Sequence, residues 1–186
     1  KCETACPSKV DYHSLLDTAR ERLGGSSRFA KQLANPKRMR WLSRLGRWLP
    51  SIHPLLKLNK ALPEGGNPPK PGVYSANRPS IGKVGLLTGC ATSVYQGGTL
   101  RAAIKLLNAV GYVVVVKESA GCCGALAKHS GDNTLANALM TANAAAFKQV
   151  DVVVSVATGC SSYLKEEADF NAEDIIGLLA DSAAWA

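Results

Sequence analysis

The placement of four cysteines constrains this chain more than any other feature of its sequence. Three short, β-branched stretches predict buried strands, at residues 83–88, 112–117 and 151–157. Each stretch is followed within a few residues by cysteine. The four cysteines concerned are Cys90, Cys122, Cys123 and Cys160.

Amphipathic or alanine-rich stretches predict helices between these strands, at residues 98–110 and 133–150, and a further helix follows at 174–179. Strands that alternate with helices favour an α/β fold with a parallel sheet and right-handed crossovers. Because the carboxyl ends of parallel strands lie at one edge of a sheet, we expect the four thiols to meet there.

The residues alone leave four interpretations of these thiols open. Buried free cysteines can act as small hydrophobic side chains. Cys122 and Cys123 could form a catalytic dithiol that cycles through a vicinal disulfide. Four thiolates could also hold zinc in a structural scaffold, or an iron–sulfur cluster. We favour the cluster, because all four cysteines follow strands and none is expected inside a helix or strand.

A second cysteine motif lies at the N-terminus. Cys2 and Cys6, the latter followed by Pro7, match the second half of the ferredoxin run C-x2-C-x2-C-x3-C-P. In a two-cluster ferredoxin these two cysteines serve different clusters. The sequence therefore predicts that Cys2 and Cys6 are ligands of ferredoxin-type [4Fe–4S] clusters.

The net charge of +8 is concentrated in one segment. Basic residues are frequent between Arg28 and Lys70, where Glu64 is the one acid. Within this segment, residues 37–49 predict a helix with Trp41, Leu45, Trp48 and Leu49 on one face. Such a helix can pack on a neighbouring domain or lie on an anionic membrane. Charge alone gives little support for nucleic-acid binding, so we expect no nucleic-acid partner.

Several classes of function are disfavoured. No stretch is apolar enough for a membrane-spanning helix, and no secretory signal is recognised, so we expect a cytoplasmic protein, peripheral at most at the inner face of the membrane. No catalytic triad, paired-carboxylate site or phosphate loop is found, and we therefore assign no catalytic residue. The chain starts without Met, and we expect it to be a fragment.

Taken together, the segments CETACPSKVDYHSLLD, GLLTGCA, SAGCCGAL and ATGCSSYLKE resemble the iron–sulfur subunit of glycolate oxidase (glycolate dehydrogenase), within the cysteine-rich CCG family. The resemblance implies an electron-transfer subunit that does not oxidise glycolate itself. It would pass electrons from flavoprotein subunits to a quinone or another acceptor. It also implies [4Fe–4S] clusters and assigns Cys90, Cys122, Cys123 and Cys160 as metal ligands.

The resemblance further implies a division into domains. Residues 1–24 would be the C-terminal part of an α-helical two-cluster ferredoxin-like domain, followed by a basic helical segment at 25–61. A linker rich in proline and glycine would occupy 62–80, and the first cysteine-rich domain 81–186. The sequence departs from the family pattern at one position, because Tyr163 stands where a fifth cysteine is expected. This departure argues against the non-cubane cluster of heterodisulfide reductases.

Overall fold

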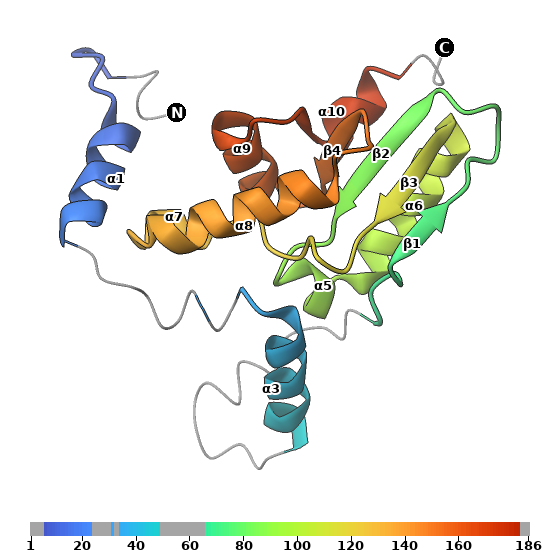
Figure 1. The fold of residues 1–186 in the computed structure, drawn as a ribbon, viewed down its shortest axis with the longest axis horizontal. Helices are drawn as coiled ribbons and strands as arrows, with labels where there is room; N and C mark the ends of the chain where they lie inside the picture. Colours follow the sequence, from blue (N-terminus) through green and yellow to red (C-terminus); the bar gives the residue numbers. More distant parts are fainter. Residues whose placement is uncertain (1–5, 24–30, 32–33, 49–65, 183–186) are drawn as a thin grey trace.

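The computed structural model describes residues 6–23, 31, 34–48 and 66–182. Its elements are shown in Figure 1. The helices are α1 (Tyr12–Leu23), α3 (Pro36–Trp48), α5 (Thr92–Tyr95), α6 (Gly97–Val110), α7 (Ala125–His129), α8 (Asn133–Ala146), α9 (Thr158–Glu167) and α10 (Ile175–Ala180). The strands are β1 (Gly72–Tyr74), β2 (Gly82–Leu87), β3 (Tyr112–Val116), β4 (Val152–Ser155) and β5 (Ala172–Asp174).

The strands form one sheet in the order β1-β3-β2-β4-β5. The four strands from β2 to β5 pair in parallel, and β1 is antiparallel to β3 at one edge. Val84 in β2 is in register with Val114 of β3 and with Val152 of β4. The predicted α/β fold with a mostly parallel sheet is confirmed.

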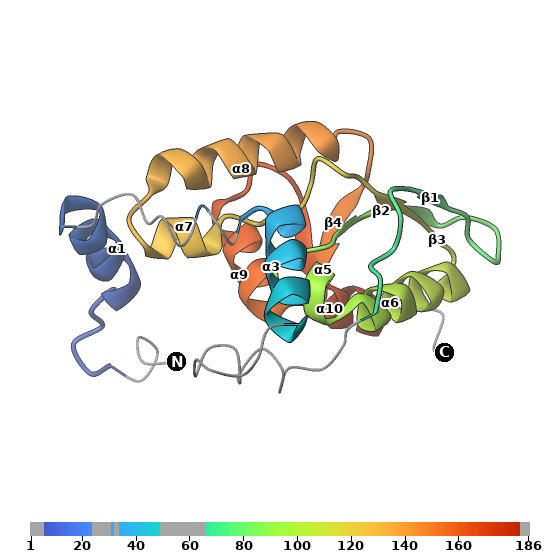
Figure 2. The same cartoon turned by 90° about the horizontal axis from the view of Figure 1, so that it is seen from below.

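Helices cover both faces of the sheet (Figure 2). Valines and leucines of β2, β3 and β4 pack on one face against Leu100 and Leu107 of α6 and Leu179 of α10. On the other face, Phe147 at the end of α8 and Leu164 of α9 pack against residues of β2 and β4. Burial on both faces explains why the central strands are nearly continuous runs of apolar residues.

Gly85 in β2 allows α8 to approach the sheet closely. A Cβ atom at this position would lie only 2.5 Å from the Phe147 ring, which is closer than carbon atoms can pack. Phe147 itself is 4% exposed. The glycine therefore leaves the space that the Phe147 ring needs to pack into the hydrophobic core on this face of the sheet.

The main strands and helices of the sheet region lie where the sequence predicts them, whereas several short elements were missed. Strand β1 lies inside the stretch expected to be a linker. It is tolerated next to prolines because it is an edge strand that pairs on one side only. The sheet thus begins before residue 81, where the cysteine-rich domain was expected to start. The predicted domain boundaries all stay predictions.

In the part of the chain that the structure describes, helices α1 and α3 precede the sheet. Helix α1 contacts α7, and His129 Nδ1 of α7 lies 3.5 Å from a carboxylate oxygen of Asp17. Helix α3 contacts α5, and Trp41 in α3 is 63% exposed. Trp48 and Leu49, predicted on the same apolar face, lie outside the described side chains. The exposure of Trp41 therefore does not support the interpretation that this face of α3 is fully packed on a neighbouring domain.

Candidate metal centre

The structure brings together the four cysteines that follow the strands. The carboxyl ends of β2, β3 and β4 lie at one edge because these strands are parallel. The Cys123 and Cys160 Sγ atoms are 3.1 Å apart, and the Cys122 side chain lies close enough to those of Cys90 and Cys123 to influence their ionisation. The thiols thus form a row in the order Cys90, Cys122, Cys123, Cys160. Their assignment as metal ligands stays a prediction.

Cys160 lies in a helix, and the expectation that no thiol would do so was wrong. It is the third residue of α9, and its backbone N–H donates to the Ala157 carbonyl at 2.9 Å. The sequence Thr-Gly-Cys-Ser-Ser at the start of α9 contains residues with weak helix propensity, which is why the helix was missed. Because Cys160 lies in the first turn of α9, its thiol is still close to the end of β4.

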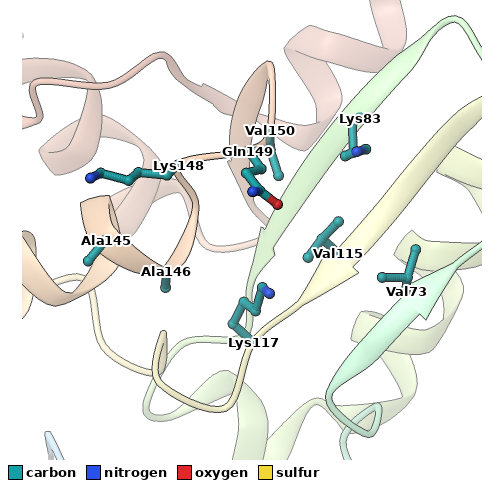
Figure 3. Close-up of a pocket in the computed structure, with 9 residues that line it drawn as sticks. All are labelled: Val73, Lys83, Val115, Lys117, Ala145, Ala146, Lys148, Gln149 and Val150. Carbon is teal, nitrogen blue, oxygen red and sulfur yellow. The ribbon is translucent and has the colours of Figure 1, made fainter.

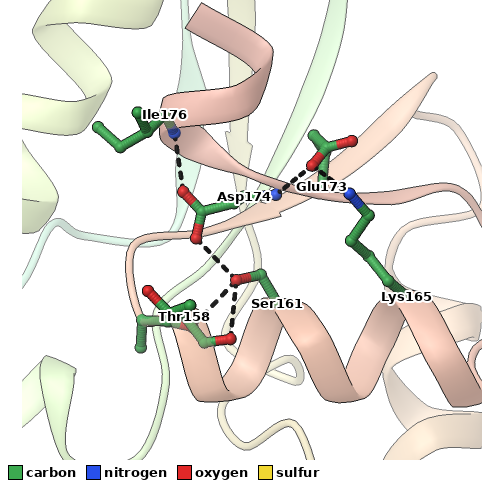
Figure 4. A network of polar contacts seen from close by, with 7 residues as sticks. Thr158, Ser161, Lys165, Glu173, Asp174 and Ile176 are labelled. Atoms are coloured by element: carbon green, nitrogen blue, oxygen red, sulfur yellow. Dashed lines mark hydrogen bonds and ion pairs between the residues drawn. The ribbon is translucent and has the colours of Figure 1, made fainter. Parts of the chain in front are cut away.

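A polar network anchors the first turn of α9 (Figure 4). The Ser161 hydroxyl donates to Asp174 Oδ2 at 2.8 Å and is also close to the Thr158 carbonyl, at 3.1 Å. Asp174 Oδ1 accepts the backbone N–H of Ile176 at the start of α10. Ser161 is 1% exposed, so its hydrogen bond with Asp174 is partly shielded from water, whereas the bond between Asp174 and Ile176 is exposed. The network therefore fixes the helix that carries Cys160 to the end of β5.

The adjacent cysteines Cys122 and Cys123 are buried, with 6% and 4% of their surface exposed. Asn143 of α8 donates from Nδ2 to the Cys122 carbonyl at 2.9 Å, and Asn143 is itself 1% exposed. Gly124 follows the pair with φ +100°, a conformation that side chains other than glycine rarely adopt. The loop after β3 is therefore held by α8 and turns at Gly124 into α7.

Tyr163 fills the position of the family's fifth cysteine. It is buried, and its ring lies next to Gly124. Its ring also lies edge-on to that of His129, with 6.4 Å between the centroids. Burial raises the pKa of Tyr163 to about 12, so the phenol is neutral at physiological pH. An aromatic side chain therefore closes this side of the site in place of a fifth thiol.

The row of hydrogen bonds makes the four thiols unequal. Its hydrogen bond with Cys122 raises the pKa of Cys90, and burial adds to this effect. Its hydrogen bond with Cys123 raises the pKa of Cys122 to about 11. For Cys123, the hydrogen bond with Cys122 lowers the pKa, but the bond with Cys160 and burial outweigh it and raise the value to about 12.

Cys160 is the exception, because the hydrogen bond that it receives from Cys123 lowers its pKa. It therefore ionises first in the metal-free protein. The thiolate is the form of cysteine that binds metals and acts as a nucleophile. At a given pH, Cys160 therefore has the largest thiolate fraction of the four cysteines.

The donor set fits an iron–sulfur cluster by number and type. A [4Fe–4S] cluster takes four cysteine thiolates, and four thiols are present. Within the described parts of the chain, no three His, Cys, Asp or Glu side chains are grouped as ligands of a single metal ion would be. The row of thiols would therefore have to open around a cluster as it binds.

The two N-terminal cysteines stand apart from this row. Cys2 lies outside the described residues. The Cys6 thiol interacts with its own turn, where backbone N–H groups of Val10 and Ser8 lower its pKa. The predicted ligand roles of Cys2 and Cys6 are not tested by this geometry.

The described residues enclose a hollow beside the thiols and a smaller one over the sheet. The larger, of about 660 Å³, has Cys122 in its wall and lies between α3, the segment 67–71 and the loops after β2 and β3. The smaller, of about 390 Å³, lies over the sheet beside the C-terminal end of α8 (Figure 3). Its lining includes Lys83, Lys117 and Lys148 but no cysteine.

Asn143, Ser161 and Asp174 support the thiol loops, and the sequence analysis missed all three. Asn143 and Ser161 are polar residues at buried positions of helices, and only the fold shows that they face the cysteine loops. Polar residues inside an otherwise apolar helix face are the one sequence signal that could have indicated them.

Comparison with known protein families identifies the part of the chain that contains the four thiols. Residues 84–165 match the family described as a cysteine-rich domain, CCG. This segment runs from β2 to α9 and includes Cys90, Cys122, Cys123 and Cys160. The similarity to the CCG family is thus located in residues 84–165. The CCG domain thus carries every thiol of the row.

The chain as a whole is similar to iron–sulfur subunits of oxidoreductases. It is 30% identical to the probable glycolate oxidase iron–sulfur subunit of Bacillus subtilis, covering 89% of this chain and 45% of the relative. It is 29% identical to the glycolate oxidase iron–sulfur subunit of Escherichia coli, covering 98% of this chain and 47% of the relative. The predicted resemblance to these subunits is confirmed.

A more distant similarity links the chain to a different oxidoreductase. One of the subunits of the fumarate reductase (CoM/CoB) of Methanothermobacter marburgensis is 27% identical over 53% of this chain and 21% of the relative. The chain spans about half the length of the glycolate oxidase subunits that it matches. No solved structure matches it significantly.

None of the helices in the described residues combines the length and apolar content that crossing a membrane requires.

Proposed function

We propose that this chain belongs to an iron–sulfur electron-transfer subunit of a flavin-dependent 2-hydroxy acid dehydrogenase complex of the glycolate oxidase type. Cys90, Cys122, Cys123 and Cys160 hold a [4Fe–4S] cluster in this proposal. The observation that supports it most is the meeting of four thiols, from loops remote in sequence, in a chain similar to proteins named iron–sulfur subunits.

The surroundings of the thiols suit a cluster that carries electrons. The cysteine pair is buried, and burial lowers the dielectric constant around a cluster and influences its reduction potential. Backbone N–H groups in the loops after Gly89 and Gly121 can hydrogen-bond cluster sulfides. The chain itself contributes no catalytic residue in this proposal, and oxidation of the 2-hydroxy acid takes place in flavoprotein subunits.

The N-terminal part completes the proposed electron route. Cys2 and Cys6 are ligands of ferredoxin-type [4Fe–4S] clusters at the end of a ferredoxin-like domain, residues 1–24. The packing of α1 on α7, with Asp17 next to His129, supports direct contact between this part and the CCG domain. Electrons would leave for a quinone or another acceptor. The complex works in the cytoplasm, with α3 as its contact to the inner face of the membrane.

A second candidate function rests on the cysteine pair alone. Cys122 and Cys123 are adjacent, free and hydrogen-bonded to each other, so a thiol–disulfide protein could use them as a redox pair. A zinc-stabilised scaffold is the third candidate, because four thiolates also satisfy zinc.

Anaerobic purification followed by metal analysis distinguishes the three candidates. The proposal predicts iron and acid-labile sulfide in about equal amounts, with a visible absorption band and an EPR signal on reduction. Zinc without sulfide would support the scaffold. A colourless protein without metal, whose activity is lost when Cys122 and Cys123 are alkylated, would support thiol chemistry.

A further inference from the structure

The hollow beside Cys122 occupies the place in the fold where α/β proteins bind ligands. Its lining includes Thr88, which follows β2, and residues from Val116 to Cys122, which follow β3. The helix after β2, α6, packs on one face of the sheet, whereas α8 after β3 packs on the other. Ligands of open α/β sheets bind in the crevice that such a switch of faces creates.

The charges around this hollow are unbalanced. Four basic side chains line it, Lys37, Arg40, Lys70 and Lys117, against the single acid Glu118. Lys37 and Glu118 pair with each other at 2.7 Å, and this pair lowers the pKa of Glu118. Arg40, Lys70 and Lys117 therefore leave an excess of three positive charges around the space in front of Cys122.

Arg40 supplies an independent sign of a ligand. Its Nε atom is buried and has no hydrogen-bond partner among the residues that the structure describes. Leaving such a donor unpaired costs free energy, so buried unpaired donors often mark a bound ion or ligand. Arginine also presents a planar fork of N–H groups that fits carboxylate and phosphate groups.

We propose that this hollow binds the oxyanion group, carboxylate or phosphate, of a small molecule. Arg40 and Lys117 hold the oxyanion, and the remainder of the molecule lies against the wall formed by Cys122. The inference rests on the proposed function and deepens it, because the bound molecule would be the acceptor that takes electrons from the cluster.

Isothermal titration calorimetry on the purified chain tests the proposal with two probes at low salt. Pyrophosphate represents the phosphate group and malonate the carboxylate group. We expect saturable binding of at least one probe, and the probe that binds more tightly identifies the source of the oxyanion. Arg40→Gln and Lys117→Gln should each weaken this binding by about tenfold, because a charge-assisted hydrogen bond is lost.

Lys148→Gln is the matched control. It removes the same charge, but Lys148 lines only the smaller hollow over the sheet (Figure 3). Binding to this variant should equal that of the unaltered chain. The proposal is overturned if neither probe binds. It is also overturned if Lys148→Gln weakens binding as much as Lys117→Gln, which would indicate binding in the smaller hollow, which both lysines line, or attraction to net charge only. Lys117 is exposed, so its variant remains informative if Arg40→Gln fails to fold.

The same samples separate this inference from the proposed function. Probe binding in protein that contains no iron after anaerobic purification would retain the oxyanion site and reject the electron-transfer role. Iron and sulfide without probe binding would retain the role and reject the site.

Discussion

At the scale of single residues, the four thiols differ in chemistry although they are neighbours. Cys123 donates a hydrogen bond to Cys160 at the end of the row, and this bond lowers the pKa of Cys160, which makes it the easiest of the four to ionise. Cys90 begins the row and is the hardest, because ionisation removes the proton that it donates to Cys122. The order of ionisation is thus a property of the row and not of exposure, since both residues are half-buried.

This order predicts the reactivity of the metal-free, reduced protein. Iodoacetamide should modify Cys160 before Cys90 between pH 7 and 9, because the lowered pKa gives Cys160 the larger thiolate fraction. As pH rises, the rate at Cys160 should level off first, while the rate at Cys90 continues to increase. Peptide mapping by mass spectrometry measures both sites in one sample. Equal rates at all pH values would contradict the row of hydrogen bonds.

At the scale of elements, the short helix α9 determines where Cys160 lies. Its first turn is held by Ser161, whose hydroxyl is buried and bonded to Asp174. Helix α3 has the opposite character, because Leu42 and Trp41 are 48% and 63% exposed while Arg38 and Arg44 are exposed nearby. Helix α9 is thus fixed to the sheet, whereas α3 exposes apolar and basic side chains to solvent.

Ser161→Ala should lower the free energy of unfolding by about 1–3 kcal/mol, because Asp174 loses a buried hydrogen-bond donor. Urea denaturation followed by circular dichroism measures this change. Ser162→Ala is the control, since Ser162 is the exposed neighbour on the same helix. A loss of the same size in both variants would mean that the network of Figure 4 does not stabilise α9.

Trp41→Gln should reduce binding of the protein to vesicles rich in anionic lipid by about tenfold, if α3 lies in the headgroup region of the membrane. Co-sedimentation with anionic and neutral vesicles provides the measurement. Ile176→Gln replaces an equally exposed apolar residue, 69% exposed, on α10 and should have no effect. Unchanged sedimentation of Trp41→Gln would leave α3 without a membrane role.

The elements also show how far the sequence could predict the structure. The valine-rich strands β3 and β4 and the helices between them follow from local patterns of apolar residues. Strand β1 and helix α9 did not, because β1 depends on pairing with β3 and α9 on the bond from Ser161 to Asp174. Such contacts between remote segments are not encoded in any local pattern.

At the scale of the whole molecule, the parallel sheet explains the candidate site. The grouping of thiols was predicted because parallel strands end at one edge. The hollow with Arg40 and Lys117 was not, since it forms between α3 and the loop after β3, which are far apart in the sequence. The sheet therefore explains where the thiols lie. The basic side chains of the hollow come from segments that only the three-dimensional fold brings together.

The most direct measurement of the central claim is the iron content of Cys90→Ser and Cys160→Ser variants, purified anaerobically beside the unaltered chain. These residues are the two ends of the row, so each variant should lose the iron and sulfide of the CCG domain and become less stable, because cluster binding and folding are coupled. Full iron and sulfide retention in both variants would contradict a shared cluster at this edge of the sheet.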